Sequence, residues 1–350
     1  MDYSQVISEA AANIIKYSFK FLIEGTQKIG KDTWTKIFAD FRPYMEQSYL
    51  HNKFVRILCS KDEDVDLESI YINSKFLSNR KEYSDEEIFE LVNESENFVI
   101  TGNGGSGKTF FMRFLWLKLF ASDLNTTPIL IELRKLNDLT TINLEAFIRR
   151  TISDGEEFSE DIFRGFCKNG RFCFILDGFD EVITDKRDEL QENILKLSRI
   201  YQDCCIVVSS RSDRRFSGWQ GFRVFESVSF RLEQVRQLIK KIPFEIKVKK
   251  IFLRNLDEKF YKDNESFLSN PLLSIMMLMT FHENMEIPSR MTIFYDQAFN
   301  TLFQWHDATK AYSRKKALDI SDFRRSFGAF CLFSYYHQDI SFSETRLLII

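Results

Sequence analysis

Residues 98–109 read Phe-Val-Ile-Thr-Gly-Asn-Gly-Gly-Ser-Gly-Lys-Thr, an apolar run followed by a turn rich in glycine. Extra glycines let such a turn curl with its backbone N–H groups pointing inward, which forms a concave nest for an anion. An apolar stretch from Thr109 to Ala121 follows, and the positive end of a helix there would add unpaired N–H donors. The spacing G-x-x-x-x-G-K-[ST] therefore predicts a loop that binds phosphate groups.

Each residue of this loop is a candidate contact to a nucleotide: Gly102, Asn103, Gly104, Gly105, Ser106, Gly107, Lys108 and Thr109. Lys108 can reach the β- and γ-phosphates, and the Thr109 hydroxyl can ligate Mg²⁺. We therefore expect ATP with Mg²⁺ as the ligand. The alternative is a flexible glycine-rich turn that carries a surface lysine.

An acidic cluster follows a second apolar run. Residues 172–176 are Phe-Cys-Phe-Ile-Leu, and Asp177-Gly178-Phe179-Asp180-Glu181 comes directly after them. A carboxylate at the carboxyl end of a buried strand points into the crevice where open α/β sheets bind their ligands. We expect Asp177 to hold Mg²⁺, and either Asp180 or Glu181 to orient and deprotonate an attacking water. An acidic, solvated turn is the alternative.

A third polar group ends the apolar run Ile206 to Val208, where Ser209, Ser210 and Arg211 follow. An arginine just past a core strand could reach the γ-phosphate, because its fork of donors suits an anionic oxygen. The further charges at 213–215 leave a basic surface turn as an alternative, and either serine hydroxyl could serve instead of the arginine.

The pattern between residues 97 and 230 alternates β-rich runs with helical stretches, which predicts an α/β fold with a mostly parallel sheet flanked by helices. After Phe230 the strand signals fade and helices are expected. The β-rich runs are Phe98–Ile100, Ile129–Leu133, Phe172–Leu176, Ile206–Val208 and Val224–Phe230, and the helical stretches include Thr109–Ala121, Leu144–Ile152 and Asp188–Ile200.

Net charge, cysteine spacing and hydrophobicity indicate the expected partners and location of the chain. A net charge of −3 over 350 residues gives no reason to expect nucleic acid or an anionic membrane as the main partner. Six cysteines without C-x-x-C spacing suit a reducing compartment, so a cytoplasmic protein is expected. The apolar run Leu272–Phe281 has about half the ~20 residues needed to cross a bilayer, which predicts a buried helix.

The three motifs, in this order, resemble the NACHT family of STAND NTPases, signalling ATPases that include animal innate-immune receptors and bacterial antiphage proteins. The resemblance covers roughly residues 97–335. Residues 267–273, Phe-Leu-Ser-Asn-Pro-Leu-Leu, are similar to the family's helical-domain motif, which implies that Pro271 touches the adenine. A simple helix-starting proline is the alternative for Pro271. Residues 295–299 and 306–310 look like the bacterial branch.

The residue patterns and the resemblance together give an expected domain order, and the resemblance implies the role of each motif. The expected parts are an N-terminal helical segment at 1–50, an acidic connector at 51–96, a nucleotide-binding domain at 97–230, a helical domain at 231–310 and the start of a winged-helix domain at 311–350. Carried over by position, Lys108 and Thr109 bind phosphate and Mg²⁺, Asp177 binds the metal, and Arg211 is the sensor. The apolar ending at 347–350 leads us to expect a C-terminally truncated chain.

The expected function is a signalling switch that hydrolyses ATP slowly and acts in bacterial immunity against phage. Its γ-phosphate would bias a two-state arrangement of the domains. The expected partners are ATP or ADP, further copies of the chain on activation, and a protein or phage-derived trigger. The alternative is a constitutive ATPase motor or phosphotransferase, although neither an L-S-G-G-Q nor an N-K-x-D motif occurs.

Overall fold

The structure is a computed structural model, and it describes residues 31–122, 126–153, 159–170, 172–284, 294, 296, 298–299 and 320–336. Residues 1–278 and 279–350 form two compact units, each of which is described by itself. The predicted helices of residues 1–30 and the 306–310 motif lie outside the described residues, as do positions 295 and 297 of the 295–299 motif.

The first unit is built on a sheet that contains, within the described residues, seven strands in the order β4-β3-β9-β5-β8-β7-β6. The five strands from β9 to β6 are parallel, and β3 and β4 extend that sheet as antiparallel strands. These strands are β3 (Lys75–Ser78), β4 (Lys81–Ser84), β5 (Asn97–Thr101), β6 (Thr127–Glu132), β7 (Phe172–Asp177), β8 (Cys205–Ser210) and β9 (Phe222–Ser227). The prediction of a mostly parallel sheet is confirmed, since each of the five expected β-rich runs falls on one parallel strand.

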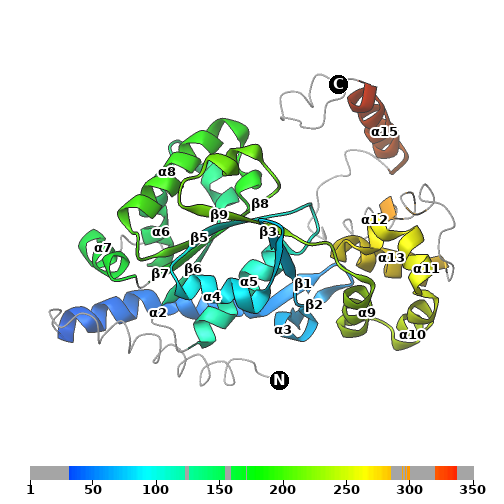
Figure 1. The fold of residues 1–350 in the computed structure, drawn as a ribbon, viewed down its shortest axis with the longest axis horizontal. Helices are drawn as coiled ribbons and strands as arrows, with labels where there is room; N and C mark the ends of the chain where they lie inside the picture. The colour runs from blue at the N-terminus through cyan, green and yellow to red at the C-terminus, as the bar shows by residue number, and fades with distance from the viewer. Residues whose placement is uncertain are drawn as a thin grey trace. The chain divides into compact units, whose positions relative to one another are not determined.

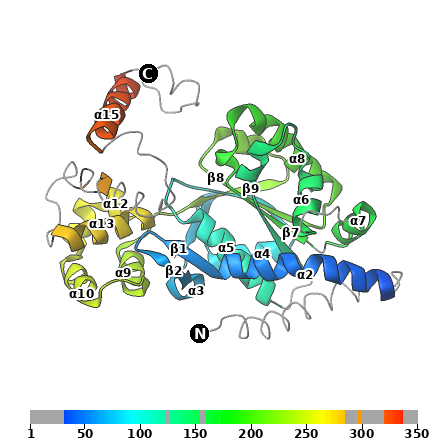
Figure 2. The same ribbon diagram turned by 180° about the vertical axis from the view of Figure 1, so that it is seen from behind.

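Helices cover both faces of this sheet (Figures 1 and 2). α5 (Lys108–Ala121) lies on one face with α4 (Asp85–Asn93), while α6 (Leu144–Ile152) and α8 (Arg187–Ile200) lie on the other. The central strands are therefore buried on both sides, which is why β7 and β8 are nearly continuous apolar runs. α2 (Lys31–Lys53) runs beside strand β6, where the Tyr44 hydroxyl donates to the carbonyl oxygen of Leu130 at 3.4 Å.

Strand order decides which loops meet. β8 lies between β5 and β7, and all three are parallel. Their carboxyl ends therefore share one edge of the sheet, where the glycine loop, the acidic cluster and the Ser-Ser-Arg segment follow the strands. Three motifs that are spread over 110 residues of sequence are brought together at this edge.

Residues 51–96, which the sequence presented as a polar connector, contain regular structure. β1 (Phe54–Ile57) and β2 (Ser60–Asp66) form a hairpin, α3 (Leu67–Ile70) follows, and β3 and β4 join the main sheet through β9. Helix α4 begins with a capping box, in which Ser84 and Glu87 satisfy each other's backbone N–H groups. The apolar residues at 70–72 are buried within the first unit.

Helices follow the sheet, as expected after Phe230. They are α9 (Leu232–Lys241), α10 (Ile246–Asn255), α11 (Glu258–Asp263), α12 (Glu265–Leu268) and α13 (Pro271–Asn284). The remaining described elements are α7 (Glu160–Lys168) and the 3₁₀ turns η1 (Leu133–Asp138), η2 (Phe179–Glu181), η3 (Thr184–Lys186) and η4 (Arg214–Gly218).

The second unit contains helix α15 (Ile320–Tyr336), and an ion pair of 3.1 Å joins Arg324 to Asp296. The winged-helix domain at 311–350, like the other domain boundaries, stays a prediction. In the described part of the chain, no helix has the length and apolar character that a membrane span requires.

Candidate nucleotide site

The glycine loop between β5 and α5 has the backbone that a phosphate nest requires. Gly105 and Gly107 adopt φ of +77° and +92°, in the left-handed region that strains any residue with a Cβ. Lys108 then opens α5, and its Nζ donates to the carbonyl oxygens of Gly102 at 2.7 Å and Asn103 at 2.9 Å. These bonds fix the lysine over the loop. Burial lowers the pKa of Lys108, and the charge of Asp180 opposes that effect.

The loop is also in contact with the start of helix α13. The side-chain amide of Asn270 donates to the carbonyl oxygen of Gly104 at 2.8 Å, and the Leu272 N–H lies 3.4 Å from the carbonyl oxygen of Gly105. The approach is close enough that a Cβ added at Gly105 would lie 2.8 Å from both Asn270 Oδ1 and Leu272 Cβ. A glycine is therefore needed at 105 for two reasons, its backbone conformation and the space that it leaves.

Asp177 lies at the carboxyl end of β7 beside two hydroxyl groups. The Ser209 hydroxyl donates to Asp177 Oδ1 and accepts from the N–H of Gly178 at 2.8 Å, while the Thr109 hydroxyl lies close enough to the Asp177 carboxylate to favour its ionised form. Burial raises the pKa of Asp177, and Ser209 and Thr109 lower it in part. The structure thus places the two expected metal ligands, Thr109 and Asp177, side by side.

Asp180 and Arg211 form a two-point contact between the acidic cluster and the end of β8. Asp180 Oδ1 accepts from the backbone N–H of Arg211 at 2.9 Å, and Asp180 Oδ2 forms an ion pair with Arg211 Nε at 3.0 Å. The Nη2 nitrogen of Arg211 lies toward the loop, since a Cβ added at Gly104 would be 3.9 Å from it. The expected sensor arginine and one of the two expected acids are therefore partners.

The acidic segment itself is held by its backbone. Asn137 donates to the carbonyl oxygen of Glu181 and accepts from the N–H of Ile183, both at 3.0 Å. Arg187 donates to the carbonyl oxygens of Asp180 at 2.6 Å and Val182 at 2.7 Å. Four bonds on consecutive backbone groups give the two acids a fixed position despite their place in a turn.

A second charged group lies behind Asp177. Glu132, at the end of β6, is 3.2 Å from His51 Nε2 and 2.9 Å from Arg134 Nη2, and these contacts lower its pKa to about 2. Arg113, one turn after Thr109 on α5, donates to the carbonyl oxygen of His51 at 3.2 Å. The positive charge of Arg113 favours the ionised form of Asp177.

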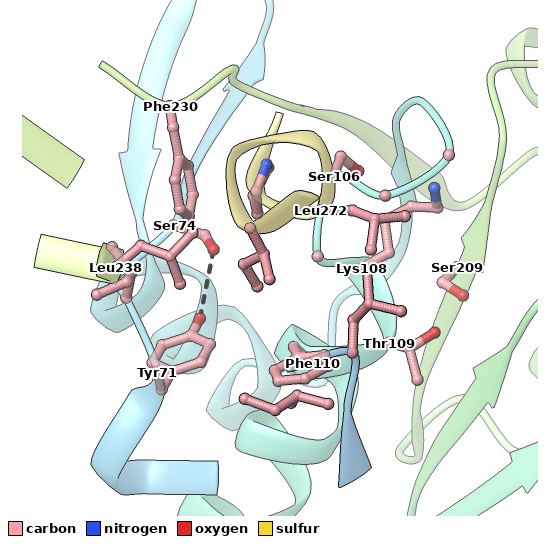
Figure 3. Close-up of a pocket in the computed structure, with 18 of the residues that line it drawn as sticks. Tyr71, Ser74, Ser106, Lys108, Thr109, Phe110, Ser209, Phe230, Leu238 and Leu272 are labelled. Carbon is pink, nitrogen blue, oxygen red and sulfur yellow. Dashed lines mark hydrogen bonds between the residues drawn. The ribbon is translucent and has the colours of Figure 1, made fainter. Parts of the chain in front are cut away.

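The phosphate loop, Asp177, Asp180, Glu181 and Arg211 line one cavity of about 440 Å³, shown in Figure 3. Lys108, Thr109 and Ser209 line one side of the cavity, and Tyr71, Phe230 and Leu238 line the other. The polar end therefore suits phosphates and the apolar end suits a flat base. Pro271, at the first position of α13, lines the same cavity.

The residues present fit a nucleoside triphosphate with Mg²⁺. The loop leaves a cradle that a Cβ at Gly105 would fill, and its N–H groups lie at the start of a helix of 14 residues. Mg²⁺ prefers oxygen ligands and is commonly bound by one or two protein groups together with phosphates, which matches the Thr109 hydroxyl and the Asp177 carboxylate. ATP would bring the remaining oxygens.

Two features of the site were not predicted from the sequence. They are the apolar end of the cavity and the hydrogen bonds by which Asn137 and Arg187 hold the acidic segment. Tyr71, Leu238 and Ile242 lie outside the motifs that we identified. For Tyr71, the available signal was the short apolar run at 70–72 within a polar stretch. No sequence signal pointed to Asn137, because an asparagine in a turn is common.

An open parallel sheet with a phosphate-binding loop at its carboxyl edge and a carboxylate on a neighbouring strand defines a P-loop NTPase fold. Residues 96–243 match the NACHT domain. This match covers the phosphate loop, the acidic cluster and the Ser-Ser-Arg segment, so this part of the chain is similar to a NACHT domain.

Several solved structures are similar to the chain. A STAND protein with a tetratricopeptide repeat sensor from Pyrococcus horikoshii is 15% identical over 62% of this chain and 32% of that one, with a TM-score of 0.39. RuvB of Thermotoga maritima is 11% identical over 71% and 76% of the two chains, with a TM-score of 0.34. The chain spans about a third of the length of the Pyrococcus protein. No curated protein matches it.

Proposed function

We propose that the chain is a signalling switch that binds ATP with Mg²⁺ and hydrolyses it slowly. The observation that carries this proposal is the contact between the phosphate loop and the start of α13, made by Asn270 and Leu272. Through this contact, a change in the loop on γ-phosphate binding or loss has a direct route to the helical region. A regulated arrangement of domains needs such a route.

Each site residue has a part in this proposal. Lys108 and the loop N–H groups hold the phosphates, Thr109 and Asp177 hold Mg²⁺, Arg211 contacts the γ-phosphate, and Pro271 contacts the base. Bound Mg²⁺ neutralises charge on the phosphates. The apolar walls of the cavity favour a nucleotide base over a small phosphorylated substrate.

Hydrolysis forms a bond between the oxygen of a water molecule and the γ-phosphorus. The bond from that phosphorus to the bridging oxygen breaks, and its electron pair leaves with ADP. The proton lost by the water passes to the carboxylate of Asp180 or Glu181. The products are ADP and inorganic phosphate.

The biological role that we propose is defence of a bacterium against phage, on the resemblance of the motifs to that branch of the family. The proposal includes a cytoplasmic location, self-association on activation and a protein or phage-derived trigger. None of these rests on the geometry of the site.

The proposal is tested with the purified chain, ATP and Mg²⁺. Calorimetry measures the binding of ATP, and the release of inorganic phosphate measures its hydrolysis. We expect tight binding with turnover far below about 10 s⁻¹, a middling value for enzymes. Lys108→Ala should abolish binding, because it removes a charge-assisted contact worth roughly 1.5–3 kcal/mol or more. Glu181→Gln should still bind nucleotide but lose hydrolysis, and Asp180→Asn should still bind nucleotide but lose most of its hydrolysis. Fast turnover by the chain alone would contradict the switch and favour a constitutive motor.

A further inference from the structure

We infer that Asp180 is a positioning residue, which orients Arg211 over the phosphate loop, and that Glu181 alone accepts the proton of the attacking water. This inference rests on the proposed function, since it concerns the γ-phosphate end of the same site. It separates the roles of two adjacent acids that the sequence leaves equivalent.

The first support is that the Asp180 carboxylate is already used. One of its oxygens accepts from the Arg211 N–H at 2.9 Å, and the other forms an ion pair with Arg211 Nε at 3.0 Å. Both oxygens are therefore engaged, and a proton taken from water would have to displace one of these contacts. Asp180 is therefore suited to hold Arg211.

The second support is the direction that this contact imposes on Arg211. The ion pair runs through Nε, and Nη2 lies near Gly104 of the loop. The arginine side chain is 71% exposed, so without a partner it would sample many rotamers. Asp180 restricts these rotamers before the nucleotide arrives.

The third support is that the anchor is rigid. Asp180 is only 22% exposed, and Arg187 holds its carbonyl oxygen at 2.6 Å. Phe179, immediately before it, is buried in edge-to-face contact with Phe216 and Trp219. The carboxylate that orients Arg211 is thus fixed by packing on one side and by backbone bonds on the other.

Glu181 differs from its neighbour in the surroundings of its carboxylate. Within the described residues its carboxylate makes neither a hydrogen bond nor an ion pair, and it lies beside Gly178, where an added Cβ would be 3.1 Å from Glu181 Cδ. Burial and the charge of Asp177 raise the pKa of Glu181. A free carboxylate with increased proton affinity, next to the metal ligand, is the better acceptor for the proton of water.

The discriminating measurement is the ratio of ATP to ADP affinity, which reports contact with the γ-phosphate independently of turnover. We expect Arg211→Ala to reduce this ratio about tenfold, as for the loss of a charge-assisted hydrogen bond. Asp180→Asn should reduce it nearly as much, and the double variant should fall no further than Arg211→Ala. Glu181→Gln should leave the ratio unchanged while abolishing hydrolysis.

Asp213→Asn is a matched control. Asp213 accepts from the N–H and the Nε of Arg215 at 2.9 Å each. Its carboxylate therefore also contacts both the backbone and the side chain of an arginine, which here lies two residues later in the chain. Asp213 does not line the cavity, so its variant should keep the ATP/ADP ratio and turnover of the parent.

The pH profile of the residual hydrolysis gives a second readout. In Asp180→Asn the acid limb, where the rate rises with pH as Glu181 loses its proton, should persist at a lower amplitude. An Asp180→Asn variant with the parental ATP/ADP ratio, or one that lacks the acid limb, would overturn the inference and make Asp180 the base. A parent chain that binds no ATP would overturn the proposed function itself, and this inference with it.

Discussion

The side-chain nitrogen of Asn270 lies 2.8 Å from the carbonyl oxygen of Gly104, which joins the start of helix α13 to the phosphate loop. The other end of the same amide, Oδ1, accepts from the N–H groups of Leu272 at 3.0 Å and Leu273 at 3.3 Å and so caps the helix. One side chain therefore satisfies donors of the helix and an acceptor of the loop, which ties the geometry of the two elements together.

Asn270→Ser tests that coupling. A serine can still cap α13, but its short hydroxyl does not reach Gly104, so the link to the loop is lost while the helix keeps its cap. We expect ATP binding to weaken several-fold with little change in the melting temperature. Asn270→Ala, which loses both contacts, should in addition destabilise the protein by about 1 kcal/mol. Parental ATP affinity in Asn270→Ser would contradict the coupling.

Gly105→Ala should abolish ATP binding. An alanine at φ +77° is strained by about 1–2 kcal/mol, and its methyl group would lie 2.8 Å from Asn270 and Leu272. Either the loop or the start of α13 must move. Gly165→Ala is the control, because Gly165 lies within α7 with open space around its Cα and should gain about 0.5–1 kcal/mol of stability. Calorimetric binding and thermal melting measure both variants.

Ser209→Ala should shift the pH dependence of Mg²⁺-dependent hydrolysis to higher pH. The Ser209 hydroxyl stabilises the ionised form of Asp177, whose pKa is already raised by burial. Without that bond the pKa rises further, so Asp177 is protonated, and unable to hold Mg²⁺, at a higher pH than in the parent. Ser210→Ala is the control, since the neighbouring buried hydroxyl has no hydrogen-bond partner among the described residues. Equal shifts in the two variants would contradict the assignment.

Asp85→Asn should remove a loss of stability that occurs as the pH rises. Asp85 is buried at the start of α4 and accepts from the Tyr71 hydroxyl at 2.9 Å, and burial raises its pKa from 3.8 to about 7. Between these values the folded state keeps a proton that the unfolded state has released, so stability falls with rising pH by at most about 1.4 kcal/mol per pH unit.

Urea unfolding between pH 4 and 8 measures this effect. Asp85→Asn keeps an acceptor for Tyr71 but carries no charge, so it should be more stable than the parent at pH 8 and show a flatter profile. Glu90→Gln, an exposed change on the same helix, should keep the parental slope. A parental slope in Asp85→Asn would place the titrating group elsewhere.

Local signals were sufficient for the sheet and the phosphate loop. The runs at 98–100 and 172–176 are apolar on both faces because parallel strands are covered on both sides, and the loop after β5 needs glycine wherever its backbone turns left-handed. Residues 51–96 gave no comparable signal. Their strands are only four to seven residues long, β2 and β4 are mostly polar, and β3 is a strand because it pairs with β9, about 150 residues away.

By itself, then, the sequence determined the fold class and the candidate phosphate-binding residues, because a short apolar run and a glycine-rich loop are specified by neighbouring residues. Only the tertiary structure decided how these candidates are combined. The order β5-β8-β7 brings Arg211 to Asp180 across 31 residues, and the start of α13 brings Asn270 to Gly104 across 166. Both contacts depend on strand order and helix packing, which arise from burial of the whole core and leave no periodicity in the local sequence.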